Sequence, residues 1–212
     1  LIISINFCTI EKSWAIADKS EYDSKLIQGT RFYYEISNDK VTIMGAELDR
    51  SKDIVIPKMI NGYPVKIIGE EAFCECIECA SYDERDNRRL KSIVIPEGIE
   101  DIESKAFYGC TSLKKIVIPK SVKKIGDYTF GECNSINNIT ISGGVEIIED
   151  YAFTGCSSLK NIKLPNSIKS LEEGIFEGCS SLQSIDIESK NYSSIDGVLF
   201  DKDKETIIKY PE

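Results

Sequence analysis

Cysteine is the residue type that offers most chemistry in this chain, which contains eight cysteines and no histidine. Three of them form the sequence Cys74-x-Cys76-x-x-Cys79, and closely spaced thiolates are potential zinc ligands. No second cysteine pair of matching spacing accompanies them, so the sequence predicts no metal site. Two alternatives stay open for Cys74 and Cys79: a disulfide within this loop, or two reduced thiols.

Cys110, Cys133, Cys156 and Cys179 recur every 23 residues, and Cys76 belongs with them by its position relative to a phenylalanine. Cys76 lies three residues after Phe73, as Cys110 lies three residues after Phe107. If each interval is one coil of a stacked structure, equivalent residues lie about 4.8 Å apart with parallel side chains. The β-carbons of a disulfide must converge to about 3.8 Å. We therefore predict a ladder of buried thiols that act as small hydrophobic side chains. Its members are Cys76, Cys110, Cys133, Cys156 and Cys179.

Composition excludes several classes of function. Without histidine the chain cannot build a Ser-His-Asp triad, a Cys-His pair or the usual zinc-enzyme site. A formal net charge of −9 disfavours nucleic acid, because binding to phosphates requires a basic surface. We predict a protein that is not an enzyme, uses no cofactor and binds no nucleic acid.

The cysteine spacing belongs to a repeat of the whole sequence. Four consecutive units of 23 residues occupy 90–112, 113–135, 136–158 and 159–181, without insertion or deletion. The first unit is LKSIVIPEGIEDIESKAFYGCTS, and the others repeat its apolar positions, its phenylalanine and its cysteine. A period of this length with an L-x-x-I-x-I core is typical of a leucine-rich-repeat solenoid.

The spacing inside a unit predicts how one coil is built. In L-x-x-I-x-I the two isoleucines point inward from a strand, and the residues around them point outward. Pro96, Pro119 and Pro165 follow directly and end strand pairing, because proline has no backbone N–H. The predicted fold is a β-rich solenoid with one short parallel strand per coil, a short helical or irregular convex side, and β-hairpin caps.

The repeats extend upstream in a stretched form. Ile54, Ile56, Pro57 and Phe73 reproduce the pattern, so we assign residues 53–188 to the repeats. This first unit contains two insertions, at 61–64 and 74–89, and the first has the composition of a turn. Insertions in repeat proteins form loops on one face. We expect the 74–89 segment to be the main irregular surface feature.

The ends of the sequence differ from the repeats. Residues 1–10 are apolar and are followed by Ala15-Ile16-Ala17, so residues 1–17 are predicted to be the remnant of a secretory signal peptide, with cleavage after Ala17. Ten apolar residues are too few to span a bilayer, so no transmembrane segment is predicted. Residues 18–52 are assigned to a linker and an N-terminal β cap, with two strands in 32–48. Residues 189–212 are assigned to a C-terminal hairpin cap or to a segment between repeats.

The repeat pattern L-x-x-I-x-I-P-x-x-V-x-x-I-x-x-x-A-F-x-G-C-x-S resembles the BspA-like class of leucine-rich repeats over about 53–188. Proline, phenylalanine, glycine and cysteine all recur in register, which makes the resemblance specific. This family occurs in surface proteins of anaerobic bacteria and some protists. The resemblance implies a secreted or cell-surface protein with an adhesive or host-interaction role and no catalytic residues.

The outward positions of the strands form the candidate ligand-binding face, because solenoids use their regular strand surface for recognition. Lysines outnumber acidic residues there although the whole chain is acidic. Such a face suits a host or neighbouring-cell surface protein, or an anionic glycan. The alternative is a structural spacer without a specific ligand. The candidate residues are Lys91, Val94, Lys114, Lys115, Val117, Asn138, Thr140, Lys160, Asn161 and Lys163.

Overall fold

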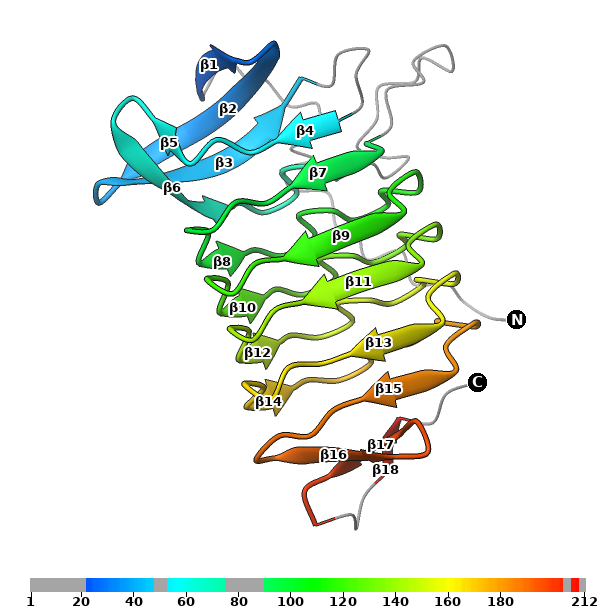
Figure 1. Ribbon diagram of the computed structural model, residues 1–212. Helices are drawn as coiled ribbons and strands as arrows, with labels where there is room; N and C mark the ends of the chain where they lie inside the picture. Colours follow the sequence, from blue (N-terminus) through cyan, green and yellow to red (C-terminus); the bar gives the residue numbers. More distant parts are fainter. Residues whose placement is uncertain (1–21, 48–52, 75–89, 204–206, 210–212) are drawn as a thin grey trace.

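A computed structural model describes residues 22–47, 53–74, 90–203 and 207–209. Within these ranges the chain forms strands and turns and no helix. Successive coils lie one above the other, with antiparallel strands at both ends of the stack (Figure 1). The segments 1–17 and 75–89, for which the sequence predicts a signal peptide remnant and most of a loop, lie outside the described residues.

One strand from each coil contributes to the front of the stack, which we call the front sheet (Figure 1). In these strands buried isoleucines or leucines alternate with exposed residues, as a one-sided sheet requires. Pairing is parallel and displaced by one repeat, so Ile116 lies beside Ile139 and Ile162 beside Ile185. The strands fall into two hydrogen-bonded ladders, β4 with β7 and β9 with β11, β13 and β15, and β7 lies next to β9. The strands are β4 (Asp53–Val55), β7 (Ser92–Val94), β9 (Lys115–Ile118), β11 (Asn138–Ile141), β13 (Asn161–Lys163) and β15 (Ser184–Asp186).

Every coil except the last, which contains β15, also contributes to a second sheet, so the prediction of a single strand per coil was wrong on this point. After the front strand the chain turns and forms another short parallel pairing, as between Ile125 and Ile148. These strands are mostly two residues long, so the sequence shows no alternation of apolar and polar residues from which they could be predicted. They are β6 (Tyr63–Ile68), β8 (Asp101–Ile102), β10 (Lys124–Ile125), β12 (Ile147–Ile148) and β14 (Ser170–Leu171). The rest of each described coil is irregular rather than helical.

The N-terminal strands extend the second sheet. β1 (Asp23–Ile27), β2 (Thr30–Ser37) and β3 (Lys40–Ala46) are antiparallel, and β3 pairs in parallel with β6. β1 lies upstream of residues 32–48, the range in which the two cap strands are predicted. The insertion at 61–64 overlaps a hairpin between β5 (Met59–Ile60) and β6, whose turn residues Asn61 and Gly62 have φ of 53° and 87°. Two positive φ values match the right-handed twist of a tight hairpin.

The C-terminal strands cover the last coil. β16 (Tyr192–Ile195), β17 (Val198–Asp201) and β18 (Ile207–Lys209) form an antiparallel sheet. The backbone N–H of Ile185 in β15 donates to the carbonyl of Gly197 at 3.0 Å. The N–H of Leu171 in β14 donates to the Tyr192 hydroxyl at 3.0 Å. Both sheets of the solenoid therefore find backbone or side-chain partners at this end.

The core is a set of ladders that run along the stack. Phe107, Phe130 and Phe153 have no exposed surface, and neighbouring phenylalanine rings lie nearly parallel with centroids 5.3–5.7 Å apart. Isoleucine, leucine and valine from each coil complete the same continuous core. No coil buries its apolar side chains alone, which is why the array is stable only when stacked. The fold class, a β-rich leucine-rich-repeat solenoid, is confirmed.

Candidate functional site

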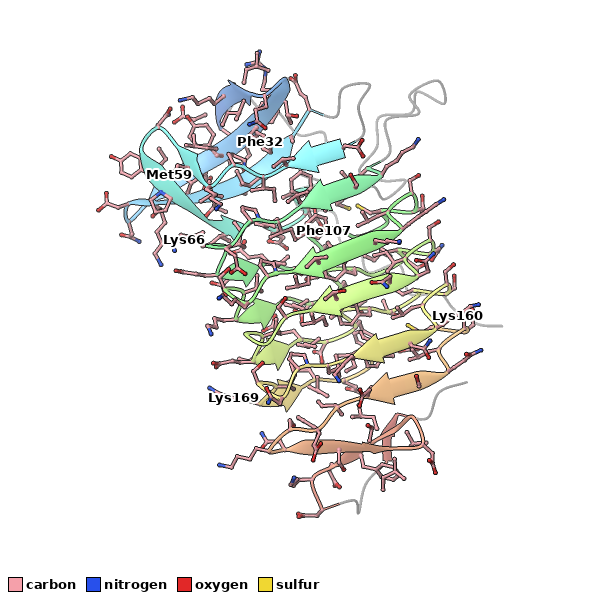
Figure 2. The ribbon with its side chains drawn as sticks, in the orientation of Figure 1. Phe32, Met59, Lys66, Phe107, Lys160 and Lys169 are labelled. Atoms are coloured by element: carbon pink, nitrogen blue, oxygen red, sulfur yellow. The ribbon has the colours of Figure 1, made fainter. Side chains whose placement is uncertain are left out.

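The structure places all ten candidate residues on the exposed side of the front sheet or at the start of its strands. We call this surface the front face. Lys160, for example, lies at the beginning of β13, while Lys169 lies beside the second sheet (Figure 2). Within each of the two ladders the strands pair in register, so equivalent residues form columns across the front face. The 23-residue repeat continues these columns from β7 to β9.

The column through the middle of the strands changes character along the stack. On the first three coils it consists of Val55, Val94 and Val117, which are 53%, 54% and 57% exposed. Val55 lies directly beside Val94 in the register of β4 and β7. Below Val117 the same column continues with Thr140, and the two lower coils add Lys163 and Asp186. The front face is therefore apolar along its centre on one half and polar on the other.

Lysines flank the valines. Lys91 and Lys114 immediately precede β7 and β9, and Lys115 is the first residue of β9. All three are exposed, and within the described part of the chain none forms an ion pair. Asp53 in β4 lies beside Ser92 in β7, and Lys115 occupies the corresponding position in β9. The Asp53 carboxylate accepts a hydrogen bond from the Ser92 hydroxyl at 2.7 Å. We call Val55, Val94, Val117, Lys91, Lys114 and Lys115 the valine-lysine patch.

Polar residues on the lower half of the front face interact mainly with one another. Lys163 forms an ion pair with Asp186 at 3.2 Å, and the Ser184 hydroxyl donates to the Asn161 side-chain oxygen at 2.6 Å. The Thr140 hydroxyl lies 3.4 Å from the Asn138 side-chain oxygen. Lys160 is exposed and forms no ion pair within the described ranges. Most of this half thus has its polar groups already engaged.

Sequence reasoning missed two residues of the front face, Val55 and Asp53. Both belong to the stretched first unit, which the insertions separate from the regular repeats. The signal was present, because aligning Ser51 with Leu90 puts Val55 at the position of Val94. The register between β4 and β7 shows the same equivalence in space.

The four described cysteines of the thiol ladder are buried inside the stack. Cys110, Cys133, Cys156 and Cys179 are at most 1% exposed. Each Sγ donates to the carbonyl of a phenylalanine on the preceding coil at 3.1–3.2 Å. Burial raises the pKa of the Cys156 thiol well above its ordinary value, so this group stays protonated. Cys74 is half-buried, while Cys76 and Cys79 lie outside the described residues.

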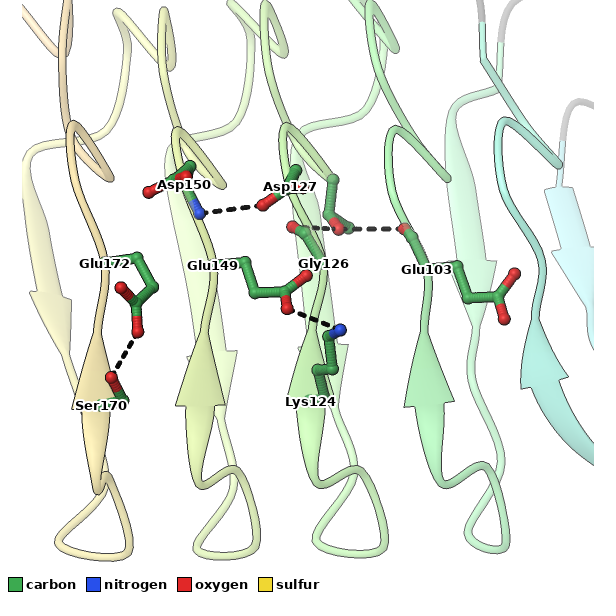
Figure 3. Close-up of polar contacts among 9 residues, drawn as sticks. Glu103, Lys124, Gly126, Asp127, Glu149, Asp150, Ser170 and Glu172 are labelled. Atoms are coloured by element: carbon green, nitrogen blue, oxygen red, sulfur yellow. Dashed lines mark hydrogen bonds and ion pairs between the residues drawn. The ribbon is translucent and has the colours of Figure 1, made fainter.

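Carboxylates gather beside the second sheet, where they hold backbone groups of the next coil (Figure 3). Asp127 accepts the N–H of Asp150 at 3.1 Å, and Asp150 accepts the N–H of Glu173 at 2.9 Å. Lys124 forms an ion pair with Glu149 at 2.6 Å. Burial raises the pKa of Asp127, and the negative charge of Glu149 raises it further.

This carboxylate row supports the turns, and it forms no metal site. In the described part of the chain no group of three potential metal ligands comes together. The described residues also include no helix that is long and apolar enough to cross a membrane.

The stacked coils and the open front face define a class of protein, the leucine-rich-repeat solenoids. The sequence matches the family described as "BspA type Leucine rich repeat region (6 copies)" over residues 83–206. The chain belongs to this family. Its fold is one that is typically non-catalytic.

Solved structures share this architecture. The T. pallidum leucine-rich-repeat protein TpLRR is 29% identical with a TM-score of 0.64, over 73% of this chain and 67% of that protein. A leucine-rich-repeat protein from Bacteroides ovatus is 28% identical with a TM-score of 0.62, over 74% of this chain and 39% of the other. The pneumococcal vaccine antigen PcpA shares the fold at 23% identity and a TM-score of 0.62, over 89% and 56% of the two chains. No curated protein matches the sequence.

Proposed function

We propose that this chain is a non-catalytic binding module that acts outside the cell and recognises a protein or an anionic glycan through the front face. Membership of the BspA-type repeat family supports the location, as does the likeness in fold to a protein described as a vaccine antigen. The observation that carries the proposed binding role is the valine-lysine patch. Three lysines without ion pairs among the described residues stand beside three exposed valines on an otherwise acidic chain.

The lysines give this surface its electrostatic specificity. On a chain of net charge −9 the acidic surface elsewhere repels acidic partners, whereas the positive strip attracts them at one place. Complementary charge mainly increases the association rate and selects the partner, and this contribution weakens with salt. Adhesion and host interaction are uses of such a surface that we propose for the chain on the basis of its family.

The test is binding of the full chain to arrays of extracellular-matrix proteins and anionic glycans at low and moderate salt. The variant Lys91→Glu/Lys114→Glu/Lys115→Glu changes the net charge from −9 to −15 by three reversals of two charges each. The matched control, Lys58→Glu/Lys120→Glu/Lys190→Glu, makes the same change at exposed lysines outside the front strands.

We expect saturable, salt-sensitive binding that the front-face variant loses and the control keeps. Equal loss in both variants would reduce the effect to net charge. Absence of any partner in both arrays would favour the alternative, a structural spacer of a larger surface protein without a specific ligand.

A further inference from the structure

The valine column is not required by the fold. The repeats provide an internal comparison, because the same position on the lower coils holds Thr140, Lys163 and Asp186 on equally regular strands. A residue that is more than half exposed at Val94 or Val117 contributes little to the core behind it. The pairing of β4 with β7 places Val55 about 4.8 Å from Val94, and β9 with Val117 lies next to β7, so the three valines form an apolar strip along the stack.

The valine column also indicates which of two kinds of partner, an anionic glycan or a protein segment, suits this surface better. An anionic glycan would engage the lysines through its acidic groups, while the aliphatic side chains between them would gain little. A protein segment with aliphatic residues would cover the valines and remove apolar surface from water. Exposed apolar surface gathered in one place, with polar residues around it, is typical of a protein-protein contact.

We infer that the valine-lysine patch binds an acidic protein segment whose aliphatic side chains pack on Val55, Val94 and Val117 while its carboxylates pair with Lys91, Lys114 and Lys115. This inference rests on the proposed function and names the partner class for the same surface. The coils not included, from β11 onward, present Thr140 and the ion pair of Lys163 with Asp186, and they supply neither the apolar strip nor the same density of available lysines.

The spacing of the valines suggests a suitable probe. An amphipathic helix presents side chains along one stripe every 5.4 Å or so, close to the coil spacing of about 4.8 Å. The first probe is a synthetic helical peptide with leucines on one stripe and glutamates beside them. The second is the same peptide with every leucine replaced by serine, so that charge is unchanged. Sulfated dextran is the third probe and represents a polyanion without aliphatic side chains.

Binding of the three probes is measured by isothermal titration calorimetry on the full chain, the triple lysine variant and Val94→Ser/Val117→Ser. We expect the leucine peptide to bind about tenfold or more tightly than the serine peptide, through burial of apolar area. The valine variant should bind both peptides with the weak affinity of the serine peptide. The lysine variant should lose all three probes. Circular dichroism and thermal unfolding establish that each variant is folded.

Each other outcome overturns a defined part of the argument. If the two peptides bind equally, and the valine variant behaves like the parent while the lysine variant fails, the surface recognises charge alone and this inference is wrong, although the proposed function stands. If sulfated dextran binds more tightly than the leucine peptide, the site is a polyanion site. If no probe responds to reversal of the lysines, the front face is not the binding surface and the proposed function fails as well.

Discussion

Lys163 and Asp186 lie directly opposite each other on β13 and β15, and their side chains form an ion pair at 3.2 Å on the exposed side of the front sheet. The side chains are 83% and 63% exposed, so the pair adds little to stability. Its main effect is on recognition, because a lysine that already faces a carboxylate offers less to an acidic partner than Lys115 does.

Lys115→Ala and Lys163→Ala should therefore differ in binding. Removing Lys115 should weaken binding of an acidic peptide about threefold, in line with roughly 0.5–1 kcal/mol for an exposed charge contact. Removing Lys163 should leave the affinity almost unchanged. Titration of both variants with the same leucine-glutamate peptide checks this, and a larger loss at Lys163 would move the binding surface to the lower coils.

Truncation within the phenylalanine ladder should depend on position. Phe130 stacks between Phe107 and Phe153, with centroid distances of 5.3 Å and 5.5 Å, whereas among the described residues Phe176 stacks on Phe153 alone. Phe130→Ala should lower the free energy of unfolding by about 3–5 kcal/mol, and Phe176→Ala by less, because its end of the ladder relaxes more easily. Urea unfolding measures both values, and equal losses would show that ring stacking adds nothing to burial.

Asp127→Asn should stabilise the protein at neutral pH. The pKa of Asp127 is raised by burial and by Glu149, so the ionised carboxylate is unfavourable in the folded state. Its contribution to stability is present below the ordinary pKa of about 3.9 and is lost as pH rises through the raised value. The amide keeps an oxygen for the N–H of Asp150. The variant should melt at a higher temperature at pH 7, and the difference should shrink toward pH 3.

Glu146 provides the control, because its pKa is shifted in the opposite direction. Glu146 accepts a hydrogen bond from Lys169, which lowers its pKa, so neutralising Glu146 removes a favourable interaction. Glu146→Gln should not raise the melting temperature at pH 7. A parallel rise in both variants would point to the net charge of the chain rather than to the surroundings of Asp127.

The buried thiols should be inert in the folded protein. Cys133 and Cys156 have no exposed surface, and each donates to a carbonyl of the preceding coil. Iodoacetamide at pH 8 should leave both unmodified in native protein and modify both in guanidinium chloride, since the thiolate and access to it are both required. Mass spectrometry of peptides gives the extent at each residue. Rapid modification of Cys156 in the native state would contradict its burial.

The sequence could predict what recurs and what alternates. Ile116 and Ile139 stand 23 residues apart between outward-facing neighbours, so their strands and the stacking of Phe107 on Phe130 follow from periodicity alone. The second sheet was missed, because pairings of two residues leave no alternation to detect. Which lysines remain available depends on side-chain geometry across coils, as the contact of Lys163 with Asp186 shows.

The register of the front sheet keeps two tasks apart. At one position Ile54, Ile93, Ile116, Ile139, Ile162 and Ile185 hold the core. One residue further along, the same strands display valine, threonine, lysine or aspartate, and the register of the paired strands stays the same. Such a scaffold can acquire a different binding partner through substitutions at its outward-facing positions alone, because the fold does not depend on the side chains that are exposed there.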